Sequence, residues 1–259
     1  MGCLFAIYGI WNFFCCKPIT QHVMRKTIIL IILLVGGTFS SNFLVNSSPS
    51  TILKELSLED HIIELVSTHS LNVEKPLPHR DVLSYGIKGY LKLQEEAKIP
   101  EGKPLTVIDF TLPSSEKRMW IIDIKEGTIL HHGHVSHGRN SGDLMAQKFS
   151  NVSSSYMSSL GFYLTGETYQ GKHGYSLRLD GLEKGFNDKA RDRAIVIHGA
   201  DYAKEEFISQ TGRLGRSLGC PAVPHEIARE LIDLIKERSL LFIFGQDEEY
   251  LDKSEILNA

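Results

Sequence analysis

Between residues 105 and 244 the chain contains short apolar runs of four to eight residues, separated by glycines and polar turn residues. Runs of that length are typical of β-strands, whereas helices need longer segments with a period of 3.6 residues. The runs lie at 105–110, 119–124, 128–135, 160–164, 175–179, 194–197 and 240–244. This pattern predicts a mostly β domain, folded as a twisted β-sandwich or a partly closed barrel.

Three other segments show helical spacing. Apolar residues recur at this spacing over 56–66 and over 82–93, with Pro76 and Pro78 between them. A third helix is expected to open at Pro224 and to close near Lys236 and Arg238, where cations suit the helix dipole. The first two helices hold too little apolar surface for an independent fold, so we expect them to pack against the β domain.

The N-terminal region has the pattern of an export signal. Met24, Arg25 and Lys26 precede an apolar run at 27–35, and small residues follow at 36–41. This run is shorter than the roughly 20 residues that a spanning helix needs, which favours cleavage over a permanent anchor. We predict a leader region at 1–45, with the signal peptide at 24–45. The alternative is that residues 1–23 form a second hydrophobic anchor, and whether they are translated stays open.

The remaining chain divides into an N-terminal helical segment at 46–102, a β domain at 103–245 and a polar tail at 246–259 that we expect to fray. About 215 residues remain after the leader, enough for one sizeable domain. The formal net charge of −3, with lysines and arginines spread along the chain, argues against a nucleic-acid partner. Export predicts a periplasmic or cell-envelope location, with membrane contact only through an uncleaved leader.

Cys220 is the one cysteine that lies after the leader; the other three are Cys3, Cys15 and Cys16. Its loop is rich in glycine and arginine, which favours a reactive thiol over a buried, inert one. A cysteine nucleophile needs a base, and His198 ends an apolar strand 22 residues earlier. Gly219 lets main-chain N–H groups near Cys220 face a substrate carbonyl as an oxyanion hole.

Several stretches together resemble the murein L,D-transpeptidase catalytic domain family, the YkuD-type domain of bacteria. The resemblance covers roughly residues 105–244 and rests on the His198-Gly199 pair and four longer segments. These segments are FSN at 149–151, SSLGFY at 158–163, TYQGKHGYSLRLDGL at 168–182 and GRSLGCPA at 215–222. The resemblance implies an L,D-transpeptidase-like fold and an exported peptidoglycan L,D-transpeptidase that acts on murein stem tetrapeptides.

Carried onto this chain, the family's chemistry makes Cys220 the nucleophile and His198 the base, with the Gly219 and Cys220 amides holding the oxyanion and Ser217 orienting the histidine. The chain departs from the general motif at Leu218, where a histidine is usual, and at Ala222, where asparagine or arginine is usual. His173 and Arg216 are the substitutes that we expect to contact substrate.

Two alternative functions and two expected absences complete the prediction. Release of the acyl group by water would make the protein an L,D-carboxypeptidase, and the sequence does not identify the acceptor. Loss of turnover would leave a murein-binding module. Cysteine and histidine suffice for acyl transfer, so no cofactor is expected. A metal site is not expected at the clustered histidines 131, 132, 134 and 137, which we interpret as polar residues on an exposed face, with the segment 137–142 as a loop at the rim of the cleft.

Overall fold

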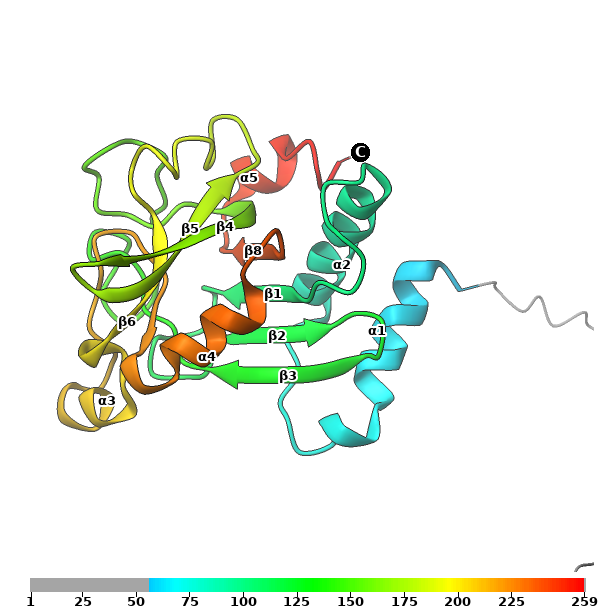
Figure 1. Ribbon diagram of the computed structural model, residues 1–259, viewed down its shortest axis with the longest axis horizontal. Helices are drawn as coiled ribbons and strands as arrows, with labels where there is room; N and C mark the ends of the chain where they lie inside the picture. Colours follow the sequence, from blue (N-terminus) through cyan, green and yellow to red (C-terminus); the bar gives the residue numbers. More distant parts are fainter. Residues whose placement is uncertain (1–55, 259) are drawn as a thin grey trace, which may run out of the picture. The chain divides into compact units, whose positions relative to one another are not determined.

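The structure is a computed structural model that describes residues 56–258; the predicted leader lies outside them. Its centre is one mixed sheet of eight strands in the order β3-β2-β1-β8-β4-β5-β6-β7 (Figure 1). The strands are β1 (Leu105–Asp109), β2 (Met119–Asp123), β3 (Thr128–Gly133), β4 (Gly161–Gly171), β5 (Gly174–Gly181), β6 (Val196–Ala200), β7 (Ala222–Pro224) and β8 (Leu240–Phe244). The mostly β class is confirmed, and each predicted apolar run overlaps a strand.

Five α-helices and two short 3-10 helices, η1 and η2, surround the sheet in the described part of the chain. They are α1 (Leu58–Thr68), η1 (Ser70–Asn72), α2 (Arg80–Glu95), η2 (Asp201–Ala203), α3 (Glu205–Thr211), α4 (His225–Ile235) and α5 (Glu248–Lys253). The predicted helices correspond to α1, α2 and α4, whereas α3 and α5 were not predicted. No helix among the described residues is apolar over enough length to cross a lipid bilayer.

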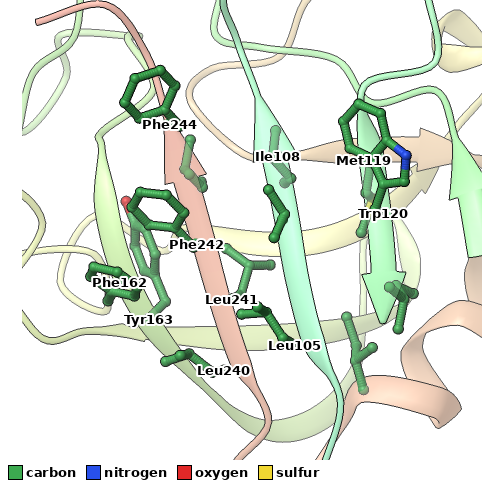
Figure 2. Close-up of a cluster of buried hydrophobic side chains, with 14 of the residues drawn as sticks. Leu105, Ile108, Met119, Trp120, Phe162, Tyr163, Leu240, Leu241, Phe242 and Phe244 are labelled. Atoms are coloured by element: carbon green, nitrogen blue, oxygen red, sulfur yellow. The ribbon is translucent and has the colours of Figure 1, made fainter. Parts of the chain in front are cut away.

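The core lies where β1 and β8 run parallel in the middle of the sheet. Both strands are buried along their whole length, and Figure 2 shows side chains from β1, β2, β4 and β8 side by side. The rings of Phe162 and Phe242 stack with centroids 4.3 Å apart. A methyl group added at Gly86 of α2 would lie 3.3 Å from side-chain atoms of Leu105 and Val107. For α2, this contact confirms the expectation that the N-terminal helices pack on the β domain.

The sheet is open rather than closed into a barrel, with β3 and β7 as its edge strands. Among the described residues, two isolated bridges join the segment after β3 to the far edge, from Ser136 to Ala222 and from Gly138 to Ser217. The closure is thus confined to a few residues, and two of them, Ser217 and Ala222, flank Cys220 in the sequence.

The C-terminal tail is ordered, so the expectation that it frays is wrong. Residues 248–253 form α5, and the Tyr250 side chain is fully buried. Its hydroxyl donates a hydrogen bond of 3.0 Å to the buried carboxylate of Glu183, which also accepts from Ser254. The tail then reaches α2, where Lys92 donates to the Glu255 carbonyl oxygen at 2.7 Å (Figure 1). The prediction failed because the segment is mostly acidic and polar, and only a few of its residues make buried contacts.

Candidate active site

Cys220 and His198 both line one pocket of about 510 Å³. Four segments build its wall: the β4–β5 turn, the approach to β6, η2, and the loop that precedes β7. The lining residues that carry polar or ionisable side chains are Tyr169, Lys172, His173, Arg193, His198, Tyr202, Arg216, Ser217 and Cys220. The structure thus brings together the predicted nucleophile, base, Ser217 and substitute residues, together with four that were not predicted.

Strand pairing explains why residues far apart in the sequence meet here. β6 and β7 are parallel neighbours, and His198 is the register partner of Ala222. Cys220 therefore lies two residues before the partner of His198, at the point where the loop enters the sheet. Antiparallel pairing of β5 with β6 places Ser176 opposite His198 and carries the β4–β5 turn to the same pocket.

The His198 ring is held in one tautomer. The side chain is 2% exposed, and its Nδ1 lies 2.9 Å from the Gly199 carbonyl oxygen. A carbonyl oxygen can only accept, so Nδ1 carries the hydrogen and Nε2 keeps a free lone pair. Burial lowers the pKa of His198. The ring is therefore neutral near pH 7 and can accept a proton at Nε2.

Cys220 is half-buried, and its sulfur faces main-chain atoms next to β6. Sγ lies 3.7 Å from the Ala194 carbonyl oxygen, to which it donates. Within residues 56–258 no hydrogen bond joins this sulfur to the His198 ring. Burial raises the pKa of the Cys220 thiol, an effect that the Val196 amide, Arg193 and Lys172 oppose. Both pKa shifts favour the uncharged forms of the thiol and the imidazole, which line the same pocket.

The turn before Cys220 requires glycine at position 219. Gly219 has φ +126°, and a Cβ there would lie 2.8 Å from the Met157 carbonyl oxygen. Its N–H donates to Ser217 Oγ at 3.0 Å, while this hydroxyl donates to the Cys220 carbonyl oxygen at 2.6 Å. The Gly219 amide is therefore already used within the loop, and the hydroxyl of Ser217 bonds to the loop rather than to His198.

Main-chain hydrogen bonds join the segment 136–139 to this loop. The Ser217 amide donates to the His137 carbonyl oxygen at 2.9 Å, and the Arg139 amide donates to the Ser217 carbonyl oxygen at 2.8 Å. The His137 side chain is fully buried, with Nδ1 2.8 Å from Arg118 Nη2. The interpretation of the clustered histidines as residues on an exposed face is wrong for His134 and His137, which are buried. His137 supports the nucleophile loop instead of lining the cleft.

His173 and Arg216, the two expected substrate contacts, reach the pocket in different ways. His173 lies in the exposed β4–β5 turn, and its ring stacks on that of His198 with centroids 4.3 Å apart. Arg216 lies 3.0 Å from the carboxylate of Asp143 and donates to the Gly142 carbonyl oxygen at 3.0 Å. His173 thus covers the base, and Arg216 reaches the pocket with part of its guanidinium already occupied.

The pocket is also lined by four residues that were not predicted, namely Tyr169, Lys172, Arg193 and Tyr202. Arg193 is half-buried, and its guanidinium bonds the segment 150–159, with 2.6 Å to the Met157 carbonyl oxygen. Its Nη2 would lie 3.3 Å from a Cβ on Gly219, which places the cation beside the nucleophile loop. The signal that could have identified it is its place five residues before His198 on the same strand approach.

Comparison with known proteins gives the class of this domain. Residues 75–244 match the family described as the L,D-transpeptidase catalytic domain. This match spans well over half of the chain, so the protein belongs to that family. No curated protein sequence matches it significantly.

Several solved structures are distantly similar in fold. An L,D-transpeptidase from Mycobacterium smegmatis is 13% identical with a TM-score of 0.35, over 55% of this chain and 59% of that one. L,D-transpeptidase 3 from Mycobacterium tuberculosis, solved with a faropenem-derived adduct, is 12% identical with a TM-score of 0.36, over 55% and 60%. One from Stackebrandtia nassauensis is 10% identical with a TM-score of 0.35, over 73% and 93%. The chain thus spans about three fifths of the mycobacterial structures.

Proposed function

We propose that this protein is an exported, cysteine-dependent peptidoglycan L,D-transpeptidase that acts on murein stem tetrapeptides in the cell envelope. One observation carries the proposal: the half-buried thiol of Cys220 shares a pocket with His198, whose ring is neutral and fixed with Nε2 free. A thiol and a tautomer-fixed imidazole are the two groups that acyl transfer requires. Family membership supplies the reaction class.

In the first half-reaction, Sγ attacks the carbonyl carbon of the third stem residue while His198 Nε2 takes the thiol proton. The carbonyl oxygen gains negative charge in the tetrahedral intermediate. We assign the Cys220 amide as its donor, because the Gly219 amide already bonds Ser217. The C–N bond to the terminal D-alanine then breaks, and Nε2 returns its proton to the leaving amine. A thioester to Cys220 and free D-alanine result.

In the second half-reaction, the amine of another stem peptide attacks the thioester carbonyl and gives a proton to Nε2. The C–S bond breaks, the sulfur takes the proton back, and a new amide crosslink forms. Water in place of the amine would release the stem as a free acid, which is the carboxypeptidase outcome. The same two side chains perform both reactions, so access of the acceptor decides between them.

The neutral resting pair distinguishes this site from one with a preformed thiolate and imidazolium. Burial raises the pKa of Cys220 and lowers that of His198, so neither group is charged before attack. Proton transfer must then accompany formation of the C–S bond. Nε2 can approach the sulfur when bound substrate displaces the thiol from the Ala194 carbonyl oxygen.

In the decisive experiment, the full chain is incubated with purified tetrapeptide murein fragments, and the masses of both the protein and the products are measured by mass spectrometry. We expect a mass increase at the Cys220 peptide, release of D-alanine and formation of crosslinked dimers. Cys220→Ser, which keeps the size of the side chain, is expected to lower acylation at least about 1000-fold. Release of D-alanine without dimers would identify the carboxypeptidase. A folded protein that binds murein but forms no acyl-enzyme would identify the binding module and contradict the proposal.

A further inference from the structure

The pocket around Cys220 carries an excess of positive charge. Three cationic side chains line it, namely Lys172, Arg193 and Arg216. None of its lining residues within the described chain is an aspartate or glutamate. The protein as a whole has a formal net charge of −3, so the local balance is opposite to the overall one. This reversal indicates that the pocket is adapted to an anionic ligand.

Arg193 contributes a charge that its partners do not neutralise. Its Nη1 donates to the Ser150 carbonyl oxygen at 2.6 Å and to Ser159 Oγ at 3.2 Å, and its Nη2 donates to the Met157 carbonyl oxygen and, at 3.4 Å, to Ser155 Oγ. All these acceptors are neutral groups, so hydrogen bonds hold the guanidinium in place while its charge acts across the pocket. The bonds also leave it little freedom to turn toward a ligand.

Arg216 retains part of its charge because it shares its counterion. The same Asp143 oxygen lies 2.9 Å from Arg213 Nε and 3.0 Å from Arg216 Nη1. Two guanidinium groups and one carboxylate leave a net charge of about +1 at this side of the pocket.

Lys172 is the cation that is free to move. It lies in the exposed turn between Gly171 and Gly174, next to His173, and forms no ion pair with a described carboxylate. An ammonium on a flexible stem can follow a bound carboxylate and donate to it directly. Lys172 therefore provides the adjustable contact, while Arg193 provides a fixed charge.

We infer that this pocket selects an acyl donor with an ionised carboxylate close to the scissile bond and disfavours donors in which that carboxylate is amidated. This inference rests on the proposed function and deepens it. The carboxylate has two sources in a stem tetrapeptide, either the terminal residue that leaves or the side chain of the residue that is acylated. The positive charge of the pocket would attract a carboxylate from either source.

The first test needs no turnover, because it compares two alkylating reagents at Cys220. Iodoacetate is anionic and iodoacetamide is neutral, and both react with the thiolate, so a change in the thiol pKa cancels in the ratio of their rates. Mass spectrometry of the Cys220 peptide in the full chain isolates this thiol from the others. We expect the iodoacetate-to-iodoacetamide ratio to exceed that of N-acetylcysteine about tenfold at low salt, and 0.5 M NaCl to reduce the excess.

Variants that remove one positive charge show which side chain raises the alkylation ratio. Lys172→Gln is expected to lower the ratio about threefold, the effect of one charge about 7 Å away in water-like surroundings. Lys184→Gln is the matched control, because Lys184 lies outside this pocket and should leave the ratio unchanged. Arg193→Gln removes loop contacts as well as charge. The Lys172 variant is therefore the one that shows whether positive charge in the pocket raises the alkylation ratio. A wild-type ratio equal to that of N-acetylcysteine would overturn the inference.

The second test uses tetrapeptide donors and separates the two sources. One donor has all carboxyl groups free, another has the terminal D-alanine as its amide, and a third has the side-chain carboxyl of the third residue as its amide. We expect kcat/KM to fall at least about threefold for the amide that removes the recognised carboxylate, and Lys172→Gln to narrow this difference. Equal kcat/KM for all three donors would overturn the inference. Charge-selective alkylation without any D-alanine release would instead overturn the proposed function alone.

Discussion

The two halves of the sheet are built by different forces. At its centre β1 pairs with β8 over all five of its residues, and both strands are entirely buried among apolar side chains. At the β7 edge, the pairing with β6 covers only three residues, and the nucleophile loop depends on bonds made by Ser217, Ser158 and the segment 136–139. Burial of apolar surface stabilises the first region, whereas hydrogen bonds shape the second.

This difference separates stability from activity. Apolar burial has no direction, so the centre tolerates exchanges of similar volume and loses free energy when volume is lost. Hydrogen bonds are directional, so a small change near Cys220 moves the sulfur with little effect on global stability. Substitutions at the centre should therefore lower the free energy of unfolding and leave the acylation rate unchanged. Substitutions near Cys220 should lower the acylation rate with little change in the free energy of unfolding.

The largest effect on stability is expected for Phe242→Ala. Phe242 is fully buried in β8 and stacks on Phe162, and its removal leaves a cavity at the centre of the sheet (Figure 2). The free energy of unfolding should fall by about 3–5 kcal/mol in urea titrations. The fraction that stays folded should acylate at the wild-type rate. Leu130→Ala, at an exposed position of β3, is the control, with a change within about 0.5 kcal/mol. A loss below 1 kcal/mol at Phe242 would mean that the centre does not dominate stability.

The reverse pattern is expected for Gly219→Ala. A methyl group would lie 2.8 Å from the Met157 carbonyl oxygen on a backbone with φ +126°. The strain is about 1–3 kcal/mol, which the loop can relieve only by moving Cys220. A displacement of that kind lowers the rate about 100-fold. Acyl-enzyme formation and thermal unfolding, measured on the same sample, check this, and a stable variant with full activity would contradict it.

The same contrast explains which features could be predicted from the sequence. The centre of the sheet was predictable because apolar runs such as 105–110 and 240–244 record burial directly in residue type. The β7 strand was not, because its three residues form no apolar run of their own and are paired within the sheet only with β6. α5 was missed because Tyr250 and a few neighbours anchor an otherwise acidic segment.

At the candidate site, Cys220 and His198 could be proposed from the sequence because a single cysteine after the leader and a histidine at a strand end form a specific motif, and the structure places both in one pocket. The place of Arg193 in the pocket could not be predicted, since its guanidinium is held by carbonyl oxygens of the distant segment 150–159. The bonds of Ser217 were also beyond prediction, because a hydroxyl near a cysteine can bond to several groups. The turn geometry, which only the structure shows, brings the Gly219 amide and the Cys220 carbonyl oxygen to the Ser217 hydroxyl.

A smaller effect is expected for Ser217→Ala. The variant leaves the Gly219 amide and the Cys220 carbonyl oxygen without the hydroxyl that bonds both. The cost is about 1 kcal/mol, and if all of it falls on the transition state, acylation slows about fivefold. Ser153→Ala, at an exposed loop position, is the matched control and should leave the rate unchanged. Equal rates for both variants would show that the Ser217 hydroxyl does not shape the loop.

The smallest effect is expected for His173→Ala, and it should appear in the pH profile rather than at neutral pH. The His173 ring covers His198, and both the burial that it provides and its charge when protonated lower the pKa of His198. Removing it raises that pKa toward its ordinary value, so His198 becomes protonated, and unable to act as a base, at a higher pH than in the wild type. The acidic limb of the kcat/KM profile should therefore move to higher pH, with little change above it. An acidic limb that stays in place, or moves to lower pH, would mean that His173 does not control the protonation of the base.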